Sequence, residues 1–167
     1  MSNPFDDQPL WQAAREQFRR RTDFDMESHA RAVTEIVAEL LEGGEPGERE
    51  TALSAAILHD VGIPEAFERY GSAAAAGQEI EGARLAREIL TRLRWPEAKV
   101  EKIADMIGHH HQRLEQPSDE FKLLYDADLI VNTIEGGLDY PTLEEHLYTE
   151  RARAIARRRV KQSCEET

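Results

Sequence analysis

Residues 48–62 read ERETALSAAILHDVG, a strongly apolar helical pattern that ends in two polar residues. Apolar side chains fill nearly every position from Ala52 to Leu58, which is typical of a helix buried on all sides. The pair His59-Asp60 follows directly, and Gly62 can end the helix. We therefore predict a central helix that carries an imidazole and a carboxylate into the interior of the protein.

Six further helices are predicted from apolar residues that recur at helical spacing. Asp25 or Ser28 can cap the helix expected over residues 25–41, since both residue types accept hydrogen bonds at helix starts. No stretch alternates apolar and polar residues for long enough to predict a strand. The sequence thus indicates an all-α protein, an irregular helical bundle of about six or seven helices. With the central helix, the expected ranges are 9–20, 25–41, 48–59, 77–93, 96–107, 119–135 and 141–161.

A chain of 167 residues corresponds to one domain. Within it, residues 1–24 are predicted to hold an N-terminal docking helix whose Trp11 and Phe18 could cover a partner, so a homo-oligomer is possible. Residues 25–138 form the predicted metal-binding helical domain. Residues 139–167 are expected to add a peripheral C-terminal helix to the same domain.

The net charge is −12, from 21 basic and 33 acidic residues, which disfavours general nucleic-acid binding and favours metal cations. The segment Met1–Asp7 lacks the basic start and apolar stretch of a signal peptide. No apolar run has membrane-spanning length, and the single Cys164 can form no internal disulfide. We expect a cytoplasmic protein without a membrane partner. A basic C-terminal segment is interpreted as a solvated face, with partner contact as the alternative: Arg151, Arg153, Arg157, Arg158, Arg159 and Lys161.

Asp128 lies in the middle of the apolar helix predicted over residues 119–135, and His29 lies on the apolar face of the second helix. An ionised aspartate in such surroundings costs several kcal/mol unless a cation or strong hydrogen bonds compensate it. Imidazoles and carboxylates together suit Mn²⁺, Fe²⁺, Co²⁺, Ni²⁺ or Zn²⁺. We therefore predict that His29, His59, Asp60 and Asp128 hold a divalent transition metal.

For any single histidine, a structural role with hydrogen bonds to the backbone is the alternative. His109, His110 and His111 either form a polar helix end or bring at least one member to the site. Successive residues point about 100° apart on a helix, which favours His110 or His111 over His109. Asp126 is interpreted as a supporting carboxylate rather than a ligand, and His146 as a surface residue.

The order and spacing of His29, His59-Asp60 and Asp128 resemble the H…HD…D signature of the HD-domain metal-dependent phosphohydrolases. Residues 58–62, LHDVG, resemble the LHDxG form of that family. Residues 125–129, YDADL, resemble its DAD segment, in which the second aspartate is the ligand. The resemblance covers about residues 27–135 and implies an HD-domain-like bundle of at least five helices.

The activity implied by the resemblance is hydrolysis of a small phosphorylated substrate, a nucleotide or another phosphomonoester. The metal would lower the pKa of water and polarise a phosphoryl oxygen. Asp60 would steer that water or accept its proton, while His110, His111 and Lys122 are candidates to hold phosphate oxygens or protonate the leaving group. Two-metal branches of the family carry a further histidine where this sequence has Gln78, so we expect one ion and doubt a second.

Two other functions stay open. Some relatives on this scaffold are iron-dependent oxygenases, which need a pair of irons and therefore more ligands. The other is a non-catalytic sensor module, in which the metal stabilises the fold or the site binds a nucleotide.

Overall fold

The computed structural model describes residues 8–136 and 139–166, and the protein is helical throughout those ranges, without a strand. The all-α prediction is confirmed, although the described chain contains more helices than expected. The expectations about Met1–Asp7 and about the Cys164 side chain lie outside the described part. The nine helices in these ranges are α1 (Pro9–Phe18), α2 (Met26–Glu42), α3 (Arg49–Leu58), α4 (Ile63–Tyr70), α5 (Ala75–Arg92), α6 (Glu97–Gly108), α7 (Asp119–Ile134), α8 (Tyr140–His146) and α9 (Glu150–Glu165).

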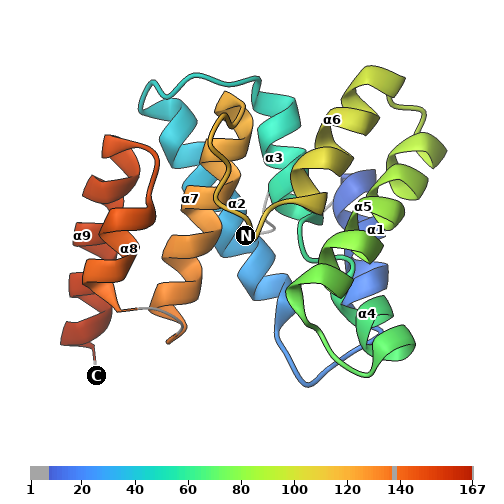
Figure 1. Cartoon of the computed structure of the whole chain (residues 1–167), viewed down its shortest axis with the longest axis horizontal. Coiled ribbons are helices and arrows are strands. Elements are labelled where there is room, and N and C mark those ends of the chain that lie inside the picture. The colour runs from blue at the N-terminus through green and yellow to red at the C-terminus, as the bar shows by residue number, and fades with distance from the viewer. Residues whose placement is uncertain (1–7, 137–138, 167) are drawn as a thin grey trace.

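Helix α3 occupies the centre of the bundle, as its sequence predicts. It packs against α1, α2, α6 and α7, and every residue from Thr51 to Leu58 is buried. Figure 1 shows α2 and α7 beside it, the α5–α6 pair on one side and α8 and α9 on the other. The pair His59-Asp60 therefore leaves α3 in the interior, between the two halves of the bundle.

Helix α2 begins where the sequence predicts. The carboxylate of Asp25 accepts a hydrogen bond of 3.0 Å from the backbone N–H of Ser28, which caps the helix. Val33, Ile36 and further apolar residues along the inner face are fully buried. His29 lies one turn before Val33 and is therefore directed inward.

Helix α4 was not expected from the sequence, because its eight residues are too short to show a clear apolar period. Gly62 precedes it, and a Cβ atom at this position would lie 2.3 Å from the Gly82 nitrogen and 2.5 Å from the Gln78 carbonyl oxygen. Only glycine therefore allows the turn after His59-Asp60 to pack directly on the backbone of α5. The glycine of the LHDVG stretch thus has a packing role.

The single C-terminal helix predicted over 141–161 is wrong, because the chain breaks at Leu147–Thr149 to form α8 and α9. The cause is the fully buried carboxylate of Asp126 on α7. It accepts hydrogen bonds from the N–H groups of Tyr148 and Thr149, at 2.8 and 2.9 Å, and from the Thr149 hydroxyl at 3.0 Å. These N–H groups cannot serve a continuous helix, so a tertiary contact sets the break.

The N-terminal helix α1 is part of the core rather than a docking element. Its Trp11 is 1% exposed and its Phe18 4% exposed, and the helix packs on α2, α3 and α5 of its own chain. These rings are therefore not free to cover a partner, which corrects that expectation. The basic face of α9 pairs with acids of its own chain, since Arg158 and Arg159 both contact Glu39. Among the described helices, none has the length and hydropathy needed to span a membrane.

Candidate metal centre

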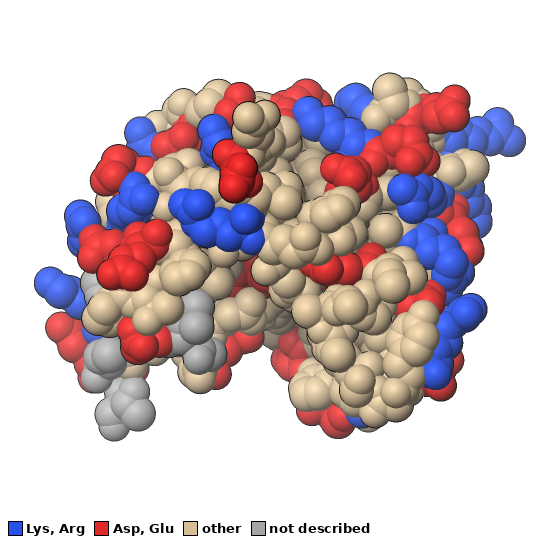
Figure 2. Space-filling model, in the orientation of Figure 1, with Lys and Arg blue, Asp and Glu red and all other residues tan. Residues whose placement is uncertain are grey.

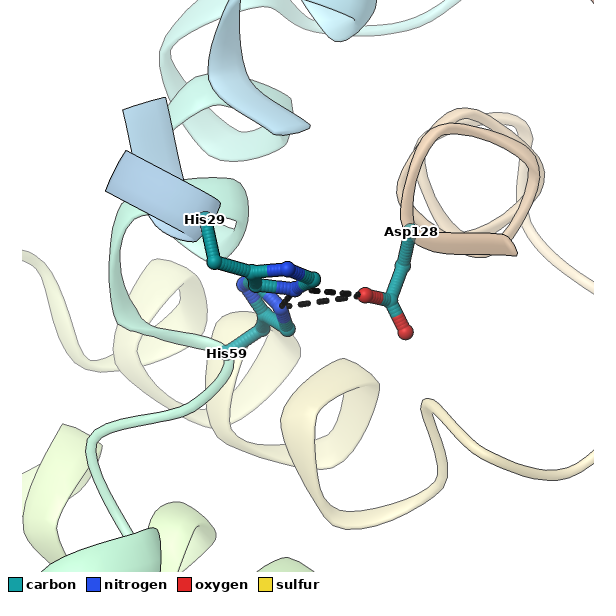
Figure 3. A group of neighbouring side chains, drawn as sticks. All are labelled: His29, His59 and Asp128. Carbon is teal, nitrogen blue, oxygen red and sulfur yellow. Dashed lines mark hydrogen bonds and ion pairs between the residues drawn. The ribbon is translucent and has the colours of Figure 1, made fainter. Parts of the chain in front are cut away.

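Side chains from three distant segments meet at one buried point, which Figure 3 shows. His29 Nε2 of α2 lies 3.0 Å from Asp128 Oδ1 of α7, and His59 Nε2 lies 3.3 Å from the same oxygen. The two Nε2 atoms are 3.3 Å apart. One ligand atom from each of the three residues lies within 4.8 Å of the others, a spacing that can enclose a metal ion.

Asp60 joins this group through one of its two carboxylate oxygens. Its Oδ2 lies 3.4 Å from His29 Nε2 and 3.3 Å from His59 Nε2. Its other oxygen, Oδ1, lies 3.6 Å from His110 Nε2. The structure therefore brings all four predicted metal ligands together, and Asp60 connects them to a second group of side chains.

Each of the three buried histidines has its Nδ1 atom engaged on the side away from the centre. Nδ1 lies 2.7 Å from the Ala56 carbonyl oxygen in His59 and 2.7 Å from the Ile107 carbonyl oxygen in His110. In His29 it lies 2.9 Å from a carboxylate oxygen of Glu135. A hydrogen on Nδ1 donates in each contact, which leaves the Nε2 lone pair free for a cation.

The two buried carboxylates of this group, Asp60 and Asp128, favour a positive charge at the centre. Burial alone would lower the pKa of His59, but the carboxylates of Asp60 and Asp128 offset it and raise the pKa well above its ordinary value. The pKa of Asp60 is lowered well below its ordinary value, because neighbouring imidazoles outweigh the effect of burial. A divalent cation would replace the shared protons, since metal binding at such sites displaces them.

The residues present fit a divalent transition metal. The Nε2 atom of His110 is buried and has no hydrogen-bond partner within the described structure, although such groups are nearly always paired. Imidazole nitrogens and carboxylate oxygens are the donors that Mn²⁺, Fe²⁺, Co²⁺, Ni²⁺ and Zn²⁺ accept. A bound ion would give this nitrogen a partner.

A second group that could hold an ion consists of Asp60, His110 and His111. The backbone N–H of His111 donates to Glu79 at 3.0 Å, which fixes the chain after α6. His109 instead turns to the surface, where its Nδ1 contacts the Asp105 carbonyl oxygen. The choice of His110 or His111 over His109 therefore agrees with the geometry, while the expectation of a single ion stays a prediction.

Lys122 does not join the centre, contrary to its predicted role. Its Nζ lies 3.4 Å from Asp119, and its side chain lines a different pocket, together with Tyr148. Six residues separate it from Asp128, so the two side chains leave α7 in different directions. The carboxylate of Asp126 faces the α8–α9 turn, which agrees with its predicted supporting role, and His146 lies on the surface.

Sequence reasoning missed two carboxylates that support the centre. Glu135 follows Asp128 by seven residues, two helical turns, and this spacing could have revealed that the two share a face of α7. Glu79 is buried on α5 and also accepts a hydrogen bond of 3.1 Å from the Gln112 side chain. No local pattern marks Glu79, because its partners are 32 and 33 residues away.

Comparison with known proteins agrees with the fold and the motif. No curated protein is significantly similar to this sequence. A solved structure of a predicted HD superfamily hydrolase from an uncultured Thermotogales bacterium is similar, with a TM-score of 0.70 and 24% identity over 93% of this chain and 86% of that one. This likeness shows a shared fold. The sequence model of the HD domain matches residues 26–133, which include all four predicted ligands. The chain therefore belongs to the HD domain family.

Proposed function

We propose that the protein is a divalent-metal-dependent phosphohydrolase that acts on a small phosphorylated metabolite, a nucleotide or another phosphomonoester, in the cytoplasm. The observation that carries the proposal is the position of Asp60. Its two oxygens face two groups of donors, with His29 and His59 on one side and His110 on the other. A carboxylate so placed lies beside any water that attacks phosphorus at this centre.

A divalent ion bound here would supply Lewis acidity, which lowers the pKa of water and polarises a phosphoryl oxygen. The protein's own residues supply the rest. Asp60 can orient the attacking water and accept its proton. His111, whose ring centroid is 3.9 Å from that of His110, can hold a phosphoryl oxygen or protonate the leaving group, whereas the Nε2 lone pair of His110 is better suited to the ion.

A second candidate is an iron-dependent oxygenase, and the Asp60, His110 and His111 group favours it, because that chemistry requires a second iron. Gln78 is a weaker ligand for that purpose than the histidine of two-metal relatives. Oxygen consumption by iron-loaded protein would support this candidate, and its absence would remove it.

The test combines elemental analysis of the purified protein with phosphate release from a panel of nucleotides and sugar phosphates in Mn²⁺, Co²⁺, Ni²⁺ or Mg²⁺. The variant Asp60→Ala should lose turnover while circular dichroism shows a folded helical protein. The surface variant His146→Ala serves as the matched control and should act like the parent. Undiminished hydrolysis by Asp60→Ala would refute the catalytic role.

A further inference from the structure

A pocket of about 410 Å³ opens beside the metal centre, and His29 and Asp60 form part of its lining. The remaining walls come from the turn before α2, from α4 and α5, and from the end of α7. This volume lies within the range of small-molecule sites. Figure 2 shows the molecule hollowed along its lower edge, between the half with α7–α9 and the half with α4 and α5, with acidic side chains inside the hollow.

The pocket is acidic apart from its histidine. Its other ionisable residues are Asp25, Asp60 and Glu135, and no lysine or arginine of the described chain lines it. The hydrogen bond from the Ser28 hydroxyl lowers the pKa of Asp25, so this carboxylate stays ionised. A metal ion can neutralise one phosphoryl group. The Arg21 guanidinium lies 5.8 Å from the centroid of Phe24 but is paired with Asp23, so further phosphates beside the metal would meet the carboxylates of Asp25 and Glu135. In water, each unit charge brought within 4 Å of a carboxylate costs about fivefold in affinity.

An aromatic ring is available at the same pocket. Phe24 lines it and is 51% exposed, which is unusual for a large apolar side chain in this protein. The ring of Phe67 supports it at 6.0 Å between centroids, and the Arg21 guanidinium lies 3.6 Å from the centroid of Phe67. An exposed, supported aromatic ring is a stacking surface for a nucleobase.

Two uncharged amides complete the lining, Gln78 and Asn132. The Gln78 amide nitrogen donates to the Ala73 carbonyl oxygen, which leaves its side-chain oxygen as an acceptor. Asn132 has no side-chain hydrogen bond within the described structure. Such amides pair with hydroxyl groups and with the edges of bases, which are uncharged.

We propose that this pocket binds a nucleoside monophosphate. Its phosphate would lie at the metal centre and its base on Phe24, and its hydroxyl groups or base edge would contact Gln78 and Asn132. Asp25 and Glu135 then select against nucleoside di- and triphosphates. The proposal rests on the function proposed above and narrows its substrate class.

The first test compares adenosine monophosphate, adenosine triphosphate and a hexose phosphate as substrates of Mn²⁺-loaded protein from which excess metal has been removed, because free Mn²⁺ would neutralise the triphosphate in solution. We expect kcat/KM for the monophosphate to exceed that for the triphosphate about tenfold or more. Asp25→Asn should narrow this ratio about fivefold, and because asparagine caps helices as well as aspartate does, α2 keeps its start. Equal use of mono- and triphosphate, or an unchanged ratio in Asp25→Asn, would overturn the selection.

The second test concerns the base. Phe24→Ala should raise KM for adenosine monophosphate about 5- to 150-fold, the usual value of one stacked base, and leave the hexose phosphate unaffected. Ile80→Ala is the matched control, since Ile80 is 61% exposed on α5 and lies outside the pocket lining. An equal loss for both substrates in Phe24→Ala would assign the ring to folding and overturn the stacking role.

The two proposals fail differently. If other phosphate esters are hydrolysed without a preference for the monophosphate, the phosphohydrolase function stands and the substrate class is wrong. If no ester is hydrolysed, the proposed phosphohydrolase function fails. Equilibrium dialysis of labelled adenosine mono- and triphosphate against Mn²⁺-loaded protein then tests whether the pocket prefers the monophosphate. Tighter retention of the monophosphate supports the inference, and equal or absent binding overturns it.

Discussion

Removal of the Glu135 carboxylate should weaken metal binding without unfolding the protein. Glu135 is 2.9 Å from His29 Nδ1, and it is the only carboxylate among the Nδ1 partners of His29, His59 and His110 within the described structure. Without it, the His29 ring can rotate, and its hydrogen can move to the nitrogen that faces the metal. Loss of such a supporting carboxylate costs about 10- to 100-fold in metal affinity, or about 1.4–2.7 kcal/mol.

The assay is calorimetric titration of metal-free Glu135→Ala with Mn²⁺ or Zn²⁺, with a urea melt in parallel. The Glu135 side chain is 49% exposed, so its removal should cost less than about 1 kcal/mol of folding stability. Glu135→Gln should fall between parent and alanine variant, because its amide oxygen still accepts the His29 N–H. Glu42→Ala, at the exposed end of α2, is the matched control. A dissociation constant in Glu135→Ala equal to that of Glu42→Ala would refute the reasoning.

Three further predictions concern stability, each measured by urea unfolding. Hydrogen bonds from Arg69 and Arg20 lower the pKa of Glu65 from 4.5 to about 2, so its stabilisation is complete above pH 4.5 and lost as pH falls through about 2. After discounting for solvent screening, Glu65→Gln should lower the free energy of unfolding by about 1 kcal/mol at pH 7. An equal decrease at pH 2 would contradict this prediction. Gly62→Ala should lower the free energy of unfolding by about 3 kcal/mol, because the new Cβ atom would lie 2.3 Å from the α5 backbone. A variant as stable as the parent would show that this close approach does not occur. Asp126→Ala should lower the free energy of unfolding by about 3 kcal/mol, because buried donors lose their acceptor. Its metal affinity should stay that of the parent, and a loss of metal binding would identify Asp126 as a ligand.

The cluster of candidate ligands was predictable because polar residues on strongly apolar helices require compensation. His59, Asp60 and Asp128 stand out for that reason from sequence alone. Glu135 did not stand out, because a half-exposed glutamate at a helix end is ordinary until its partner across 106 residues is known.

Parts of the fold depended on contacts that no local pattern records. The break between α8 and α9 follows from Asp126, which lies more than 20 residues earlier in the chain. The apolar stripe with Trp11 and Phe18 correctly predicted a helix, but periodicity shows only that a face is covered. Whether its own chain or a partner covers it is a tertiary question.

The hydrogen bonds of Asp126 also tie the turn between α8 and α9 to the part of the chain that the family model matches. The family match ends at residue 133, whereas the donors that satisfy Asp126 belong to Tyr148 and Thr149. A protein truncated after α7 would expose apolar surface and leave this carboxylate without its donors, two residues from the candidate ligand Asp128. Recombinant work on the HD domain of this chain should therefore retain the two C-terminal helices, although the region matched by the family model stops short of them.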